Sequence, residues 1–300
     1  MSINLTVNLI KKRKIKVKQS FYFLTLLLDD GRLATSHNSQ FFIYNLENLK
    51  CDILINKVDV SSIHQLVNGK IMILANTLEI YNISKNSFSC IYTIKNENLI
   101  NSILPISNDI MISTGETNEL TFWNSNHPYN VLYSKHLENC EDCLISYKTK
   151  TNNLLILRNI KDIKLIFYSL DTYKCIGSVP TLHETPHEIL ETSNNKLILS
   201  NCYQLWVIDL KNILIVHKYL IPYNKLGRCF GCYIEIDDNI LLMGDSDGAL
   251  LMYDFDKNIV KKQKHQCHKT QIKLIIKLKE NVIATVSFDN TIKLWYLNIN

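Results

Sequence analysis

Residues 282–295 read VIATVSFDNTIKLW, and this stretch decides the fold. An apolar, β-branched segment enters a polar turn around Asp289, and a second alternating segment ends on Trp295. Alternating segments of this length on either side of a turn are typical of a β-hairpin. The end of the chain therefore predicts two paired antiparallel strands.

The same hairpin pattern recurs along the whole chain. Its last aromatic or apolar residue falls at Tyr44, Tyr81, Trp123, Tyr168, Ile208, Tyr253 and Trp295. Neighbouring copies are 37 to 45 residues apart, which is the spacing of four-stranded propeller blades. We predict an all-β, seven-bladed β-propeller with four-stranded antiparallel blades, forming one domain over residues 1–300. Six or eight blades remain the alternatives, because some copies are degenerate.

Polar turns precede the hairpins at regular places. Examples are Asp29-Asp30-Gly31, Asn68-Gly69, Thr151-Asn152-Asn153, Ser193-Asn194-Asn195 and Asp237-Asp238-Asn239. Glycine is scarce, and Asn also tolerates a left-handed backbone, so we expect Asn to take its place in the turns. Inner strands such as Ile71–Leu74 and Ile240–Met243 are nearly continuous apolar runs, as expected for sheets covered on both faces.

The two ends of the sequence are expected to share one blade. Only five residues follow Trp295, so the last copy has no outer strand of its own. Residues 3–10 alternate between apolar and polar side chains and have no local partner. We predict that Ile3–Ile10 completes the final blade and closes the ring of blades; Ile15–Lys18 is the alternative.

Residues 284–295, ATVSFDNTIKLW, resemble the strand–turn–strand signature of WD-repeat proteins. By this resemblance, the family's structural hydrogen-bond network would comprise His268, Asp289, Trp295, and Thr285 or Ser287. A buried imidazole and a buried indole N–H need partners, which a carboxylate and a hydroxyl supply. The resemblance is weaker in the other copies, where the turn residue is Asn38, Asp162 or Asp247.

The resemblance implies a non-catalytic protein–protein interaction scaffold or adaptor that needs no cofactor and no metal. Partners of such proteins usually bind the face that carries the turns between the paired strands. The residues expected there are His37, Glu116, Lys161, Ser246 and Phe288, together with Tyr223 and Arg228 of the loop Pro222–Arg228. Aromatic and Arg side chains are enriched at binding interfaces, so Tyr223, Arg228 and Phe288 are the main candidates.

A basic run, KKRKIKVK at residues 11–18, supports the first alternative function. It is of the kind that contacts nucleic acid, directs nuclear import or meets acidic lipid. We favour a solvated loop or edge strand, with Ile15 and Val17 inward, since no aromatic residues that could stack on bases interleave with the run. The net charge of +5 is also too small to indicate nucleic acid by itself. The alternatives are thus a subunit of a nucleic-acid-associated complex and, from another class, a propeller-fold hydrolase or lyase with carboxylates facing the channel.

Metal-binding patterns occur in the sequence but in unsuitable contexts. The segment His183–His187 reads HETPH, and Pro186 disrupts the helix that a zinc peptidase motif needs. The pairs Cys140/Cys143 and Cys229/Cys232 lie too far apart for one zinc module. We therefore expect no metal site.

Nine cysteines without a disulfide framework indicate reduced, mostly buried thiols. This composition favours a cytoplasmic protein, with the nucleus as the alternative compartment. No apolar run approaches the roughly 20 residues of a membrane helix, so we expect no membrane partner.

Overall fold

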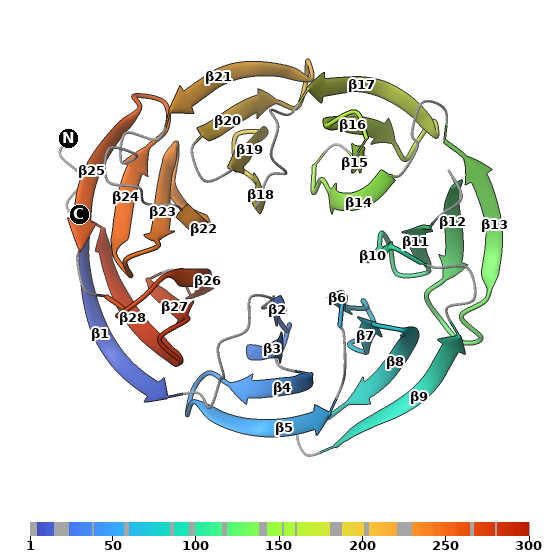
Figure 1. Cartoon of the computed structure of the whole chain (residues 1–300), viewed down its shortest axis with the longest axis horizontal. Helices are drawn as coiled ribbons and strands as arrows, with labels where there is room; N and C mark the ends of the chain where they lie inside the picture. The colour runs from blue at the N-terminus through green and yellow to red at the C-terminus, as the bar shows by residue number, and fades with distance from the viewer. Residues whose placement is uncertain are drawn as a thin grey trace. The chain divides into compact units, whose positions relative to one another are not determined.

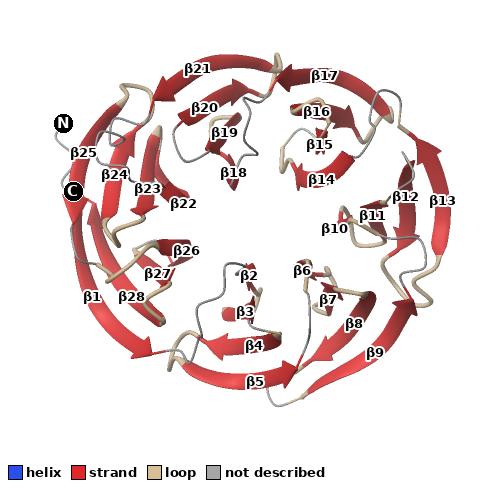
Figure 2. Cartoon of the chain, viewed as in Figure 1, coloured by secondary structure: helices blue, strands red, loops and turns tan. Residues whose placement is uncertain are grey.

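A computed structural model shows how the sequence pattern is realised. It describes residues 5–14, 24–37, 39–56, 60–84, 87–95, 100–115, 119–137, 143–151, 153–159, 161–180, 188–200, 204–220, 230–264, 267–279 and 281–299. The described residues form seven antiparallel four-stranded sheets, and every regular element among them is a strand (Figures 1 and 2). The fold is the seven-bladed, all-β propeller predicted from the repeats. Since the described chain has no helix, it also has none that could cross a membrane.

The chain divides into two compact units. The unit formed by residues 20–183 holds blades one to four. Blade one comprises β2 (Leu24–Leu27), β3 (Arg32–His37), β4 (Gln40–Asn45) and β5 (Lys50–Asn56). Blade two comprises β6 (Ser62–Gln65), β7 (Ile71–Leu74), β8 (Thr77–Ile83) and β9 (Phe88–Lys95). Blade three comprises β10 (Ser102–Pro105), β11 (Ile110–Thr114), β12 (Glu119–Asn124) and β13 (Val131–His136). Blade four comprises β14 (Cys143–Lys148), β15 (Leu154–Asn159), β16 (Lys164–Ser169) and β17 (Lys174–Pro180).

The other unit, residues 1–19 with 184–300, holds blades five to seven. Blade five comprises β18 (Glu188–Glu191), β19 (Lys196–Ser200), β20 (Gln204–Asp209) and β21 (Leu214–Leu220). Blade six comprises β22 (Phe230–Asp237), β23 (Ile240–Asp245), β24 (Leu250–Asp254) and β25 (Ile259–Lys264). Blade seven comprises β26 (Ile272–Lys279), β27 (Val282–Ser287), β28 (Thr291–Ile299) and β1 (Leu5–Lys14).

The N-terminal strand completes the last blade, as the alternation at residues 3–10 predicts. β1 pairs with β28 along its length, from Leu5 opposite Ile299 to Lys14 opposite Thr291 (Figure 1). The predicted end at Ile10 is too early. The register shifts between Leu9 and Lys11, and such a bulge interrupts the side-chain alternation while the pairing continues. The alternative strand Ile15–Lys18 lies outside the described residues.

The predicted hairpin ends all lie in the third strand of their blades, β4, β8, β12, β16, β20, β24 and β28. The turns that precede the hairpins also have the expected backbone. Gly31, Gly69, Asn153, Asn195 and Asn239 all have positive φ values, between 47° and 80°. Asn therefore does serve as the left-handed turn residue in three of these blades.

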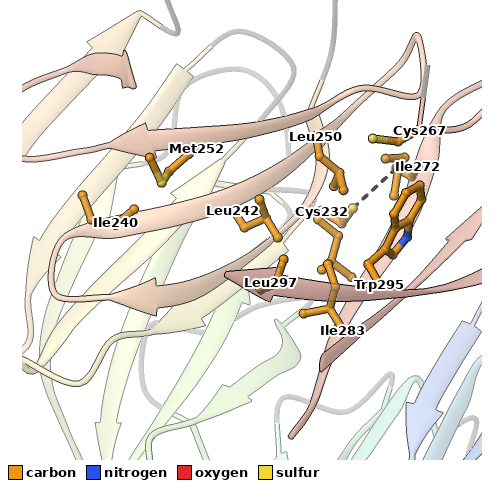
Figure 3. Packing of buried hydrophobic residues seen from close by; sticks show 11 residues of the cluster. Cys232, Ile240, Leu242, Leu250, Met252, Cys267, Ile272, Ile283, Trp295 and Leu297 are labelled. Atoms are coloured by element: carbon orange, nitrogen blue, oxygen red, sulfur yellow. Dashed lines mark hydrogen bonds between the residues drawn. The ribbon is translucent and has the colours of Figure 1, made fainter. Parts of the chain in front are cut away.

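Each blade buries its apolar strands on both faces. All four residues of β7 and all six of β23 are buried, as the continuous apolar runs predict. Side chains of blades six and seven pack together around Trp295, with Leu242, Cys232 and Ile272 in the same cluster (Figure 3). Fully burying a side chain of this size contributes about 1.5–3 kcal/mol, so such clusters dominate the stability of the unit.

Candidate functional site

A buried hydrogen-bond network lies at the base of the blade-seven hairpin turn. His268, in the segment that leads into β26, has its side chain fully covered. Its Nε2 lies 2.7 Å from Oγ1 of Thr285, and the indole Nε1 of Trp295 donates to the same hydroxyl over 2.7 Å. Its Nδ1 lies 3.1 Å from Oδ2 of Asp289. Thr285 thus joins the imidazole to the indole, and the structure brings together four of the residues expected in the network.

Ser287, the other hydroxyl considered for the network, has a different position. Its Oγ donates to the carbonyl of Thr270 over 3.0 Å and accepts the amide N–H of Asp289 over 3.1 Å. It therefore fixes the turn backbone. Asn290 completes the turn with a φ of 61°, a value that Asn adopts readily.

Two contacts around Asp289 are not evident from the sequence pattern. The hydroxyl of Thr291 donates to Oδ1 over 2.5 Å, and the amide of Lys269 donates to Oδ2 over 3.0 Å. The pKa of Asp289 is lowered from its ordinary value. Burial alone would raise it, but the bonds from Thr291 and Lys269 and the nearby His268 together lower it. Thr291, two residues after the turn Asp, could have been suggested by its hydroxyl at the start of a strand.

A buried lysine lies beside the network. Lys293 is 7% exposed; its ammonium group donates to the carbonyl of Cys267 and lies 5.7 Å from the centre of the Trp295 ring. The bond to Cys267 and the network of His268 attach the segment before β26 to β28 at two places. The entry segment and the hairpin are therefore held as one body.

The network supports a partly exposed aromatic side chain at the turn. Phe288 directly precedes Asp289, and the ammonium group of Lys273 lies 4.5 Å from the centre of its ring. We call residues Ser287–Asn290 with Lys273 the Phe288 turn. A cation over an aromatic face is a favourable electrostatic contact, and it places charge and apolar area side by side.

The corresponding turn of blade six lies next to the entry of blade seven. Asp245 is fully buried, and its Oδ1 accepts the amides of Asp247 and Ala249. Asp245 therefore occupies the role that Ser287 has in blade seven. The carbonyl of Gly248 accepts the amide N–H of His268 over 2.8 Å. A Cβ atom at position 248 would lie 2.3 Å from the carbonyl oxygen of His268, so a larger residue does not fit there. Ser246 is partly exposed in this turn.

The other predicted partner-binding residues are distributed as follows. Lys161 is exposed in the turn between β15 and β16, and His37 is the last residue of β3. Glu116, Tyr223 and Arg228 lie outside the described residues, as does the HETPH segment. Of the described residues in this set, Ser246 and Phe288 lie in the corresponding turns of two neighbouring blades, six and seven, of one unit.

The cysteines differ in part from the expectation. Cys232 and Cys267 are buried, but Cys90 and Cys175 are free thiols and exposed. Cys143 is disulfide-bonded. The expectation of a reduced thiol is therefore wrong for Cys143, which is buried. The expectation of burial is wrong for Cys90 and Cys175, because they lie on the outer strands β9 and β17, which the residue type alone does not indicate. Within the described ranges, no three His, Cys, Asp or Glu side chains are grouped so as to hold a metal.

Comparison with known proteins adds no identification, because neither protein-family models nor curated protein sequences match this chain. A function can therefore be inferred only from the fold and from the geometry described above.

Proposed function

We propose that the chain is a WD-repeat-type propeller that acts as a non-catalytic scaffold in the cytoplasm, with the Phe288 turn contacting a protein partner. The observation that carries this proposal is the network under the turn. His268, Asp289, Thr285 and Trp295 hold the backbone, so a partner does not have to order the turn on binding. A rigid aromatic side chain beside a cation has the character of an interface anchor.

The surroundings of His268 support a structural rather than a catalytic role. A His–Asp pair is the most enzyme-like pair in this region, but the His268 side chain has no solvent exposure. Its two ring nitrogens lie within hydrogen-bonding distance of Thr285, Thr291 and Asp289. A general base must reach the proton that it abstracts, and this imidazole is enclosed by its own partners.

The test is affinity purification of the tagged protein from nuclease-treated lysate, followed by mass spectrometry. Proteins captured by the wild type should be lost with Phe288→Ala and depleted with Lys273→Ala. Tyr296→Ala is the matched control, since Tyr296 is an aromatic residue exposed on β28, away from the turn. Melting curves should show that all variants remain folded.

Two results would contradict the proposal. The first is an unchanged set of captured proteins with Phe288→Ala. The second is a set of proteins that is captured only from a parallel lysate without nuclease and is lost when Lys11–Lys14 are changed to Ser. Nucleic acid held by the basic part of β1 would then be the contact.

A further inference from the structure

The outer strand of blade three differs from the other outer strands. Val131, Leu132 and Tyr133 of β13 are 45%, 46% and 45% exposed. The pairing with β12 shifts register at this point, from Phe122 opposite Tyr133 to Trp123 opposite Val131. Leu132 is therefore the extra residue of a bulge, and three successive large apolar side chains are exposed. Where the exposure of side chains on β5, β9, β17, β21 and β25 is described, exposed large apolar residues occur singly or at alternate positions, as with Leu54 of β5 and Leu214 of β21.

β13 is also the edge of its sheet. The strand order is β10-β11-β12-β13, and within the described chain β13 pairs only with β12. An edge strand has backbone N–H and C=O groups that can pair with one more strand. Adding an extended peptide to such an edge is a common mode of peptide recognition.

A cavity of about 360 Å³ lies at the C-terminal end of β13. It is lined by Lys135, His136, Tyr168, Tyr173, Lys174 and Cys175. Two lysines and a histidine give this lining a basic character, and no carboxylate is among the described residues that form it. The nearby Asp171 carboxylate lies 2.5 Å from the side-chain amide of Asn153 and does not line the cavity. Lysines act as point charges toward anionic groups, so the cavity suits a negatively charged side chain.

Aromatic side chains hold the walls of this cavity. Phe122 is fully buried, stacks on Tyr133 with ring centres 4.4 Å apart, and meets Tyr173 edge-on at 5.5 Å. The ammonium group of Lys135 lies 5.1 Å from the centre of the Tyr173 ring. The hydroxyl of Tyr168 donates to the carbonyl of Tyr173 over 2.5 Å. These contacts join β12, β13 and the turn before β17 before any ligand binds.

We propose that β13 and this cavity bind an extended peptide segment of a partner protein that carries an anionic side chain. The peptide pairs with the edge of β13, its apolar residues contact Val131–Tyr133, and its anionic group enters the cavity between Lys135 and Lys174. The anionic group is a carboxylate or a phosphate, which share the same charge chemistry. This surface is separate from the Phe288 turn, so it adds a second contact to the proposed scaffold.

The first step of the test selects peptides with a displayed library of random 12-residue sequences. The best binder is then synthesised with Glu, phosphoserine or Gln at its anionic position, which distinguishes a carboxylate from a phosphate. We expect the peptide with Gln at the anionic position to bind about tenfold more weakly than the peptide with the anionic residue. The protein variants Lys135→Gln and Lys174→Gln should each weaken binding of the anionic peptide by about the same factor. Lys50→Gln is the matched control, because Lys50 is exposed at the start of β5 as Lys174 is at the start of β17. The Phe288→Ala protein should bind the peptide as tightly as the wild type does. This result distinguishes peptide binding at β13 from the proposed partner contact at the Phe288 turn.

The second step uses Cys175 as a reporter of the cavity. Cys175 and Cys90 are both free and exposed, and they lie opposite Tyr168 and Tyr81 at corresponding places of two blades. With peptide at ten times its Kd, alkylation of Cys175 by N-ethylmaleimide should slow about tenfold, while that of Cys90 stays unchanged. Hydrogen exchange of β13 amides should slow at the same time.

Three results would overturn the proposal. One is a selection that enriches no acidic peptide. Another is peptide binding that ignores Lys135 and Lys174, or that leaves the alkylation of Cys175 unchanged. The third is a slow alkylation of Cys175 without peptide that becomes faster when Glu138, Glu141 and Asp142 are changed to Gln, Gln and Asn. This result would mean that acidic residues of the chain itself, and not a partner peptide, occupy the cavity.

Discussion

Blade seven and blade one carry the same buried hydroxyl in very different surroundings. Thr285 stands two residues after Ile283, which pairs with Trp295; Thr35 stands two residues after Leu33, which pairs with Tyr44. Both threonines are at most 1% exposed. Thr285 contacts the Trp295 indole and the His268 imidazole, whereas Oγ1 of Thr35 has no hydrogen-bond partner among the described residues.

Blade three is intermediate between them. Ser113 occupies the same register position, two residues after Met111, and accepts the Trp123 indole N–H over 2.8 Å. We therefore expect the buried hydroxyl to stabilise a blade only where its hydrogen-bond partners are present. Because an unpaired buried polar group costs free energy, the hydroxyl should stabilise blade seven most and blade one not at all.

The largest effect is expected for Thr285→Val. The change removes one hydroxyl and leaves both the indole N–H and an imidazole nitrogen without it, so the free energy of unfolding should fall by about 3 kcal/mol. Urea denaturation measures this. A loss under about 1 kcal/mol would mean that the network contributes little to the stability of the turn.

Ser113→Ala should have a smaller effect, about 1–2 kcal/mol, because only the Trp123 indole N–H loses its acceptor. The same denaturation series gives the ranking directly. If Ser113→Ala lowers the free energy of unfolding more than Thr285→Val does, the buried hydroxyl contributes more to blade three than to blade seven, which contradicts the expected order.

The acid side of the stability profile should depend on Asp289. Its folded-state pKa is lowered from 3.8, so its carboxylate stabilises the fold at higher pH, and this contribution is lost as the pH falls below 3.8 toward the lowered pKa. The stability difference between wild type and Asp289→Asn should therefore narrow below about pH 4. Melting curves from pH 6 to pH 3 check this, and a constant difference would exclude the role of the Asp289 charge.

The smallest effect is expected for Thr35→Val in blade one. Val keeps the shape and removes a hydroxyl that has no partner, so stability should stay unchanged or rise by up to about 1 kcal/mol. A clear loss of stability would show that Thr35 has a bond in solution, and blade one would then resemble blade three.

The sequence predicts the fold well because the repeat is encoded locally. Each blade carries its own alternating strands and its own turn, and the turn residues Asn153, Asn195 and Asn239 adopt the left-handed backbone that their type suggests. The end of β1 is predicted less well, since the bulge after Leu9 continues the pairing into residues whose alternation has stopped.

The sequence predicts a site only where the residues belong to one blade and the segment that leads into it. His268, Thr285, Asp289 and Trp295 were found through a resemblance to a known motif. Thr291 and Lys269 were missed because their contacts depend on the shape of the turn. The cavity beside β13 was missed altogether, since its lining comes from three separate segments that only the pairing of strands and the packing of blades three and four bring together.

Photo-crosslinking shows whether Phe288 contacts a protein partner. A benzophenone amino acid is placed at position 288 in one variant and at position 296 in another, and both are irradiated in cells. We expect a discrete crosslinked protein at position 288 that is absent at position 296. No crosslinked protein at position 288, or the same species at both positions, would contradict it.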